Sequence, residues 1–471
     1  MRKIFGDTIK VFLSNFIQIL SGILIGFVIP KIMGITDYGY YKIFTLYTAY
    51  TGLCQFGFLD GLTIKFGGCN LEQINKEEFS LYFRFFVLLQ ILCGIVLLTV
   101  ATLILPNDYR IIVVLLSVYM VIMNTTAFFQ MLSKITLRFN ELALRNVLQA
   151  IMISCAVLVL QVLFKVNDIE VKYYTYIWVL LTIYFLLMVW YFVTYREVIS
   201  ISNAKTVRRT LDANFQYIRA GFPVMVAYLC STLILTLDRQ FVSVLFDTPT
   251  YAIYAFAYTI LALVTTALSA LATVIYPNLK RLDEKNLIEK YPKLITLFFI
   301  FAFGSLVFYY PLIAFVKWYL PQYSDSIVIF RIVLPSVVVS AAITIVMQNY
   351  YVALNEGRQF FKKTVIALML ALITNSIAYI AFKSTLAISM ASVIVSLIWY
   401  TISDSFFVKN FQIKWKKNCF YMVLIILVFY LCTEIKNTIV GIVGYLFAYF
   451  IISALMYKNF FYSLICKLKN R

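Results

Sequence analysis

Long apolar runs recur along almost the whole chain, and they constrain the fold more than any other feature. Each run is about twenty residues long, the length that an α-helix needs to cross a hydrocarbon core of about 30 Å. A transmembrane strand would need only about ten residues with alternating polarity, and these runs do not alternate. We therefore expect an all-α polytopic membrane protein of about fourteen helices. The expected spans are 11–33, 38–59, 82–105, 111–132, 142–164, 173–194, 217–246, 251–276, 293–316, 326–350, 364–382, 385–407, 419–434 and 438–457.

The composition agrees with lipid as the solvent and argues against catalysis. Hydrophobic residues make up 63% of the chain and charged residues 13%, too few to cover a soluble protein. The eight cysteines form no CxxC pair and the chain has no histidine, so we expect no metal and no cofactor. An acid-x-acid spacing occurs only at Asp168 and Glu170, in a short connector, which disfavours a membrane glycosyltransferase or polymerase.

The positive charges predict the topology. With the amino terminus inside, thirty of the 40 lysines and arginines fall in cytoplasmic connectors and seven in outer ones. The positive-inside rule therefore places both termini in the cytoplasm. The net charge of +19 is better explained by this topology and by contact with anionic lipids than by nucleic acid, which we do not expect as a partner.

The longest cytoplasmic connector predicts a division into two halves. We expect an amino-terminal six-helix bundle at 1–200, a cytoplasmic linker at 201–215, a carboxy-terminal six-helix bundle at 216–408, and two additional helices with a cytoplasmic tail at 409–471. Six spans in each half would give both halves the same orientation, as in a parallel repeat.

Several short motifs resemble one known family. They are Asn15, Ile29 to Gly34, Asp37 to Tyr41, Gly57, Gly221 to Pro223, Asp238 with Arg239, and Tyr251 to Tyr254. Together they resemble the polysaccharide (O-antigen and oligosaccharide-lipid) flippases of the multidrug/oligosaccharidyl-lipid/polysaccharide exporter superfamily. Lys65 departs from the pattern, because many relatives carry arginine shortly after the second span.

The resemblance implies a V-shaped exporter of two bundles in the bacterial cytoplasmic (inner) membrane. The implied substrate is an oligosaccharide on undecaprenyl pyrophosphate, flipped to the outer leaflet by alternating access for O-antigen or capsule synthesis, with polysaccharide polymerase machinery as a possible partner. A lipid II flippase or a multidrug/cation antiporter of the same fold is the alternative.

Ionisable residues in or near the spans are the candidate site, since each is costly in the membrane. Those near the outer ends, which could ring a cavity that attracts pyrophosphate or could snorkel, are Lys31, Lys42, Arg239 and Arg331. Those at the cytoplasmic ends are Lys65, Arg84 and Arg219. Asp60 and Asp238 are candidates for an ion pair or for ion coupling. Successive residues on a helix are about 100° apart, so we expect Asp238 to pair with another helix, through Arg331 or Lys42.

Uncharged polar residues at mid-depth fit two roles equally well. They could bind sugar hydroxyls or form hydrogen bonds between helices. They are Asn15, Gln18, Gln90, Asn124, Gln161 and Asn375.

Overall fold

The computed structural model describes residues 2–69, 72, 74–168, 170–199, 207–279, 283–411 and 415–458. Within those ranges every regular element is a helix, and eleven helices are long and apolar enough to cross a membrane. Phe16–Ile32 and Lys417–Thr433 are shorter apolar helices that correspond to the first and thirteenth expected spans. The expected all-α membrane fold is confirmed. The span expected at 38–59 is the one that matches none of these apolar helices.

The chain forms two compact units, and their boundary falls between Thr232 and Leu233, inside a single 39-residue helix. This helix, α9, runs over Val207–Leu245. The linker expected at 201–215 is therefore helical from Val207 onward. Residues 201–206 of that linker and 459–471 of the expected tail lie outside the described residues.

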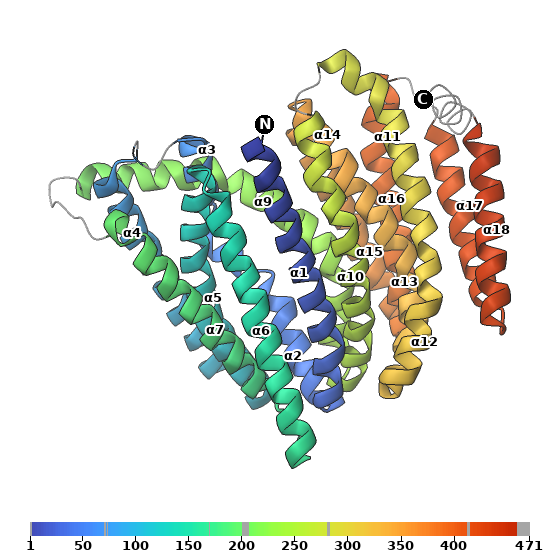
Figure 1. The fold of residues 1–471 in the computed structure, drawn as a ribbon, viewed down its shortest axis with the longest axis horizontal. Coiled ribbons are helices and arrows are strands. Elements are labelled where there is room, and N and C mark those ends of the chain that lie inside the picture. The colour runs from blue at the N-terminus through green and yellow to red at the C-terminus, as the bar shows by residue number, and fades with distance from the viewer. Residues whose placement is uncertain are drawn as a thin grey trace. The chain divides into compact units, whose positions relative to one another are not determined.

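The first unit is a bundle of long helices (Figure 1). Its elements are α1 (Arg2–Ile32), α2 (Ile35–Thr48), the 3₁₀ turn η1 (Thr51–Gln55), α3 (Phe58–Phe66), α4 (Lys76–Ile104), α5 (Asn107–Ile135), α6 (Phe139–Asn167), α7 (Tyr173–Thr194), α8 (Arg196–Ile199) and the first part of α9. An aromatic core between α3, α4 and α5 buries Phe58, Phe86 and Phe128 completely.

The second expected span is broken because its backbone turns left-handed. Phe56 and Gly57 have φ angles of 51° and 76°, which an α-helix cannot accommodate. Side chains of neighbouring helices satisfy the polar groups at this break. Asn124 Nδ2 donates to the Thr51 carbonyl at 2.9 Å and to Gln90 Oε1 at 2.7 Å. Gln90 and Asn124 therefore serve as bonds between helices, one of the two roles that their positions allowed.

Glycines let two helices cross with their backbones in contact. The first part of α9 runs across α3 (Figure 1). A Cβ atom on Gly221 would lie 2.5 Å from the Gly61 amide nitrogen, and one on Gly61 would lie 2.8 Å from Tyr217 Cα. Both distances are far inside van der Waals contact, so this crossing requires glycine at both positions.

Asp37 joins the start of α7 to α2. Its carboxylate accepts hydrogen bonds from Lys172 Nζ and from the Tyr173 amide, each at 3.1 Å. The hydrogen bond that Lys172 donates to Asp37 raises the pKa of the exposed Lys172 ammonium. This contact fixes the connector that precedes α7.

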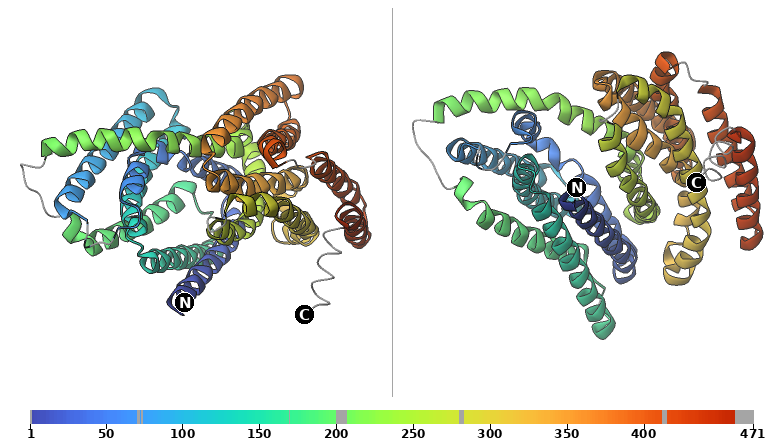
Figure 2. Two further views of the ribbon diagram at one scale, coloured as in Figure 1. Left: turned by 90° about the horizontal axis from the view of Figure 1, so that it is seen from above. Right: turned by 45° about the horizontal axis from the view of Figure 1, so that its top comes forward.

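The second unit is also helical, and it contains a hairpin at its carboxy-terminal end. Its elements are the rest of α9, α10 (Thr248–Leu279), α11 (Glu284–Gly304), η4 (Ser305–Phe308), α12 (Tyr309–Tyr319), η5 (Pro321–Tyr323), α13 (Ser326–Ala341), η6 (Ala342–Met347), α14 (Gln348–Ala353), α15 (Gly357–Phe382), α16 (Thr385–Phe411), α17 (Trp415–Thr433) and α18 (Thr438–Met456). Helices α17 and α18 lie side by side in both views of Figure 2.

Two irregular turns interrupt the long helices of this unit. The 3₁₀ turn η4 separates α11 from α12, and Tyr445 of α18 donates a hydrogen bond to the Phe303 carbonyl beside it at 2.6 Å. The turn η6 is a π-helix between α13 and α14. π-turns inside α-helices are rare and often mark functional sites.

Candidate functional site

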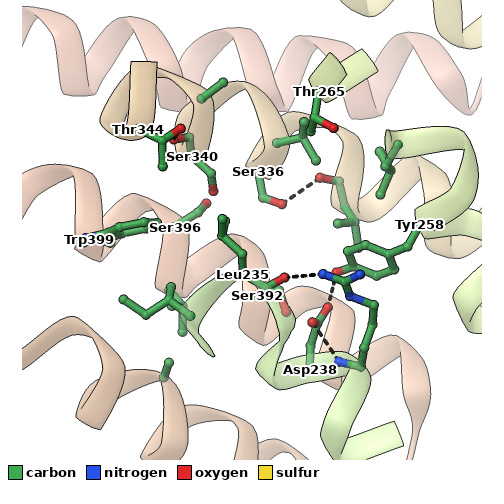
Figure 3. A pocket seen from close by; sticks show the side chains of 18 of the residues that line it. Leu235, Asp238, Tyr258, Thr265, Ser336, Ser340, Thr344, Ser392, Ser396 and Trp399 are labelled. Atoms are coloured by element: carbon green, nitrogen blue, oxygen red, sulfur yellow. Dashed lines mark hydrogen bonds between the residues drawn. The ribbon is translucent and has the colours of Figure 1, made fainter. Parts of the chain in front are cut away.

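A polar cavity lies inside the second unit, between α9, α10, α13, η6, α15 and α16 (Figure 3). Its volume is about 320 Å³. Its polar or charged lining residues are Asp238, Arg239, Tyr258, Thr265, Ser336, Ser340, Thr344, Asn375, Ser392 and Ser396, together with the indole of Trp399. Polar groups within membrane-spanning helices are costly, so their convergence on one cavity marks it as the candidate site.

Asp238 is buried at the edge of this cavity, where neutral donors surround its carboxylate. Only 3% of the residue is exposed. Tyr254 donates a hydrogen bond to Oδ2 at 2.9 Å, and Tyr258 donates to the same oxygen. The Arg239 amide donates to Oδ1 at 2.8 Å. These three hydrogen bonds fix the position of the buried carboxyl group.

Arg239 lies next to Asp238 in sequence and lines the same cavity. Its guanidinium carbon is 4.5 Å from the centre of the Tyr258 ring, close enough for a cation–π contact. Nη2 donates to the Leu235 carbonyl at 2.7 Å, whereas the buried Nε makes no hydrogen bond. Tyr258 therefore contacts both groups: its hydroxyl binds the Asp238 carboxylate, and its ring faces the Arg239 guanidinium.

Hydroxyl groups line the wall opposite this pair (Figure 3). Ser336 and Ser396 donate to carbonyls of their own helices at 2.7 Å each. Such bonds occupy the hydroxyl proton and leave oxygen lone pairs for a bound molecule. Asn375 Oδ1 and Trp399 Nε1 are buried without any hydrogen bond, and both residues line the cavity. An acceptor, a donor and several hydroxyl oxygens are thus available to a polar ligand.

Arg331, expected at the same site, lies elsewhere. Its Nη1 forms an ion pair of 2.6 Å with Glu434 Oε1, and Arg331 is not among the residues that line the cavity. The expected pairing of Asp238 with Arg331 is therefore wrong. Glu434 lies 103 residues farther along the chain, and only the packing of α17 against α13 brings it close.

The other candidate cations belong to the first unit and are dispersed. Lys42 on α2 lies over the rings of Tyr38 and Tyr41, at 5.2 and 5.4 Å from their centres. Lys31, at the end of α1, is exposed. These positions do not place Lys31 and Lys42 in a shared cavity, so their role at an outer mouth stays a prediction.

The candidates expected at the cytoplasmic ends lie on three helices of the first unit. Lys65 and Asp60 are on α3, Arg219 is on α9 and Arg84 is on α4. All three cations are exposed, and Asp60 is half-buried beside Gly221 where α3 crosses α9. The crossing brings the helices of Lys65, Asp60 and Arg219 together, whereas Arg84 lies on a separate helix.

Several residues that line the cavity or bind Asp238 were absent from the sequence-based set. Tyr254 and Tyr258 follow Asp238 by 16 and 20 residues, and their hydroxyls reach it only because α10 packs against α9. The hydroxyl residues did carry a signal, because Ser336, Ser340 and Thr344 recur every four residues. A polar residue at every helical turn of an apolar span indicates one face that avoids lipid.

The apolar helices define a multi-pass membrane protein, and the buried polar cavity lies among the helices of its second unit. Over 97% of this chain and 99% of the other, the fold matches a structure described as lipid II flippase MurJ in an inward closed conformation, with a TM-score of 0.70 and 15% identity. A Vibrio cholerae MATE transporter, VcmN, matches 88% of this chain and 98% of its own, with a TM-score of 0.55 and 12% identity. An outward-facing multidrug resistance MATE family transporter of the MOP superfamily matches 86% of this chain and 94% of its own, with a TM-score of 0.53 and 11% identity.

The family follows from the sequence itself. The family model described as polysaccharide biosynthesis protein matches residues 4–283, more than half of the chain. The protein therefore belongs to this polysaccharide biosynthesis family, and the resemblance in its motifs is confirmed. No curated protein sequence matches the chain.

Proposed function

We propose that this protein flips an undecaprenyl-pyrophosphate-linked oligosaccharide from the cytoplasmic to the outer leaflet, for O-antigen or capsule synthesis. The observation that carries the proposal is the polysaccharide biosynthesis family match over residues 4–283. A flippase moves its substrate without changing a covalent bond, so no catalytic residue is assigned. We place the protein in the bacterial cytoplasmic membrane with both termini inside, on the distribution of its lysines and arginines.

The charged residues support an anionic substrate over a cationic drug. A multidrug antiporter needs an acidic group that can take up a cation, and Asp238 is buried beside Arg239 and already holds two tyrosine hydroxyls. Arg239 lines the cavity, and its buried Nε makes no hydrogen bond. Guanidinium groups bind phosphate oxygens through charge-assisted hydrogen bonds.

We assign ion coupling to Asp238. Its carboxylate is fixed by donors from α9 and α10, so a change in its charge would alter the contact between these two helices. A proton on Asp238 would thereby bias one arrangement of the cavity over another, as alternating access requires. Lys65, Arg84 and Arg219 remain proposed contacts for the head group on the cytoplasmic side.

Deletion of the gene tests the substrate directly. We expect lipid-linked oligosaccharide to accumulate on the cytoplasmic leaflet while surface polysaccharide disappears, and mass spectrometry of the lipid fraction would identify the sugars. The result that contradicts the proposal is intact surface polysaccharide with no accumulated lipid-linked glycan. Complementation with the wild-type gene is the control for effects on neighbouring genes.

A lipid II flippase is the second candidate, favoured by the similarity of fold to a lipid II flippase across 97% of this chain. Depletion of the protein separates the two candidates. Arrested peptidoglycan synthesis with accumulated lipid II would support this alternative. Continued cell-wall synthesis with lost surface polysaccharide would support the oligosaccharide substrate.

A further inference from the structure

A second polar site lies in the first unit, around Arg145 on α6. Arg145 is only 4% exposed. Its guanidinium lies over the Tyr191 ring of α7, with 3.9 Å between the guanidinium carbon and the ring centre, and the centre of the Trp190 ring is 5.0 Å away. One nitrogen, Nη2, donates to Thr194 Oγ1 at 2.7 Å. The buried Nε and Nη1 make no hydrogen bond.

The charges around Arg145 do not balance. Glu141 is its acidic neighbour, with 3.6 Å between Glu141 Oε2 and Arg145 Nη1. The same carboxylate pairs more closely with Arg138, at 2.5 Å, and accepts a hydrogen bond from Tyr195 at 3.2 Å. Two guanidinium groups therefore share one carboxylate, and the cluster keeps one positive charge. Arg138 is partly exposed, so solvent screens its charge, whereas the buried Arg145 has only the longer contact with Glu141. A buried charge with a weak partner is costly, and cation–π contacts offset only part of that cost.

Arg145 lines a small cavity of about 10 Å³. The Tyr191 hydroxyl lines it and is buried without a hydrogen bond. The remaining lining residues are Met123, Thr126, Gln130, Asn146, Gln149, Tyr184 and Leu187. Buried donors from α6 and α7 thus meet at a space large enough for about one water-sized species.

We propose that this cavity binds one small monovalent anion, such as chloride. Arg145 Nε and Nη1 and the Tyr191 hydroxyl donate to the anion, which neutralises the surplus charge of Arg138, Glu141 and Arg145. The size of the cavity excludes phosphate, sulfate and a lipid head group. A water molecule could accept the same hydrogen bonds but would not neutralise the surplus positive charge. That charge therefore favours an anion over water. The site is separate from the cavity in the second unit and does not depend on the transported substrate.

Thermal unfolding of the purified full-length protein in detergent tests the proposal. At constant ionic strength, gluconate is replaced stepwise by chloride or bromide. We expect a saturable rise in Tm of about 2–4 °C with either halide, because an anion that binds only the folded state stabilises it. Sulfate, which is too large for the cavity, should produce no saturable rise.

Three variants show whether the effect arises at this cavity. Arg145→Gln should abolish the halide-dependent rise in Tm. Tyr191→Phe keeps the aromatic ring and removes only the hydroxyl, so it should shift the halide titration to higher concentration even if Arg145→Gln does not fold. Arg358→Gln, which removes an exposed arginine on α15, is the matched control and should keep the full rise.

Anomalous X-ray diffraction from crystals grown in bromide gives an independent result. An anomalous peak between Arg145 and Tyr191 would support the site. Two outcomes would overturn it: a Tm that is equal in gluconate and halide for the wild-type protein, or an equal halide effect in wild type, Arg145→Gln and Tyr191→Phe.

Discussion

Arg331 on α13 and Glu434, at the end of α17, form an ion pair in which Nη1 and Oε1 are 2.6 Å apart. The pair ties the carboxy-terminal hairpin to the helix that contributes one wall of the cavity. A hydrogen bond from Tyr430 to the Ile332 carbonyl, at 2.7 Å, joins the same two helices. We therefore interpret Arg331 as a residue that holds the hairpin in place rather than as a contact for the substrate.

Charge reversal tests this role of Arg331. Arg331→Glu should lower the stability by about 0.2–1 kcal/mol, because Glu434 is largely exposed and the pair is screened by solvent. The double variant Arg331→Glu with Glu434→Arg should recover most of that loss in thermal unfolding, and each variant should keep transport. Loss of transport in the double variant, with stability restored, would instead assign Arg331 to substrate binding.

Asp238→Asn should reduce transport by at least about tenfold, which corresponds to about 1.4 kcal/mol. The amide keeps the size of the side chain and removes the charge that we assign to coupling. The measurement is flipping of lipid-linked oligosaccharide in proteoliposomes, with and without an ion gradient. Asp108→Asn, at an exposed acid at the start of α5, is the control and should behave as wild type. Unchanged, gradient-dependent flipping by Asp238→Asn would contradict the coupling role.

Gly221→Ala should destabilise the first unit by about 1–3 kcal/mol, since the new methyl group would overlap the backbone of α3 at Gly61. Gly22→Ala on α1 is the matched control, because a Cβ atom there meets nothing within 4 Å. It should be neutral or stabilising by about 0.5–1 kcal/mol, as expected for glycine replaced within a helix. Thermal unfolding in detergent measures both effects. Equal shifts for the two variants would show that the close crossing of α3 and α9 does not limit stability.

Tyr445→Phe should cost about 0.5–1.5 kcal/mol by removing the hydrogen bond to the Phe303 carbonyl. The residue is fully buried, so the lost bond is not replaced by water. Tyr228→Phe, at a tyrosine that is 71% exposed, should leave the unfolding temperature unchanged. If both variants unfold alike, the hairpin does not support the break at η4.

The sequence predicted the spans well because lipid imposes a simple requirement on each helix separately. Thirteen of the expected spans correspond to apolar helices, and the exception is broken at Phe56 and Gly57, where two consecutive residues are left-handed. Hydropathy does not register such a break, because the side chains remain apolar on both sides of it.

Contacts between distant segments were beyond the reach of the sequence. Asp238 and Arg239 were identified from their cost within a span, which is a property of each residue alone. The tyrosine donors to Asp238 and the partner of Arg331 depend on which helices are neighbours. Local periodicity cannot supply that information in a chain with many similar apolar helices.

The π-helical turn η6 has a mechanical consequence for the cavity. Ser336, Ser340 and Thr344 line one wall at intervals of four residues, and η6 begins between the second and the third. A π-turn holds about one residue more than an α-turn. Conversion of this turn to regular α-helix would lengthen the helix formed by α13, η6 and α14 by about 1.5 Å. It would rotate α14 by about 100° relative to α13. The π-turn therefore gives this wall one extra residue. Its conversion to α-helix would rotate and shift α14 along the helix axis without breaking the chain.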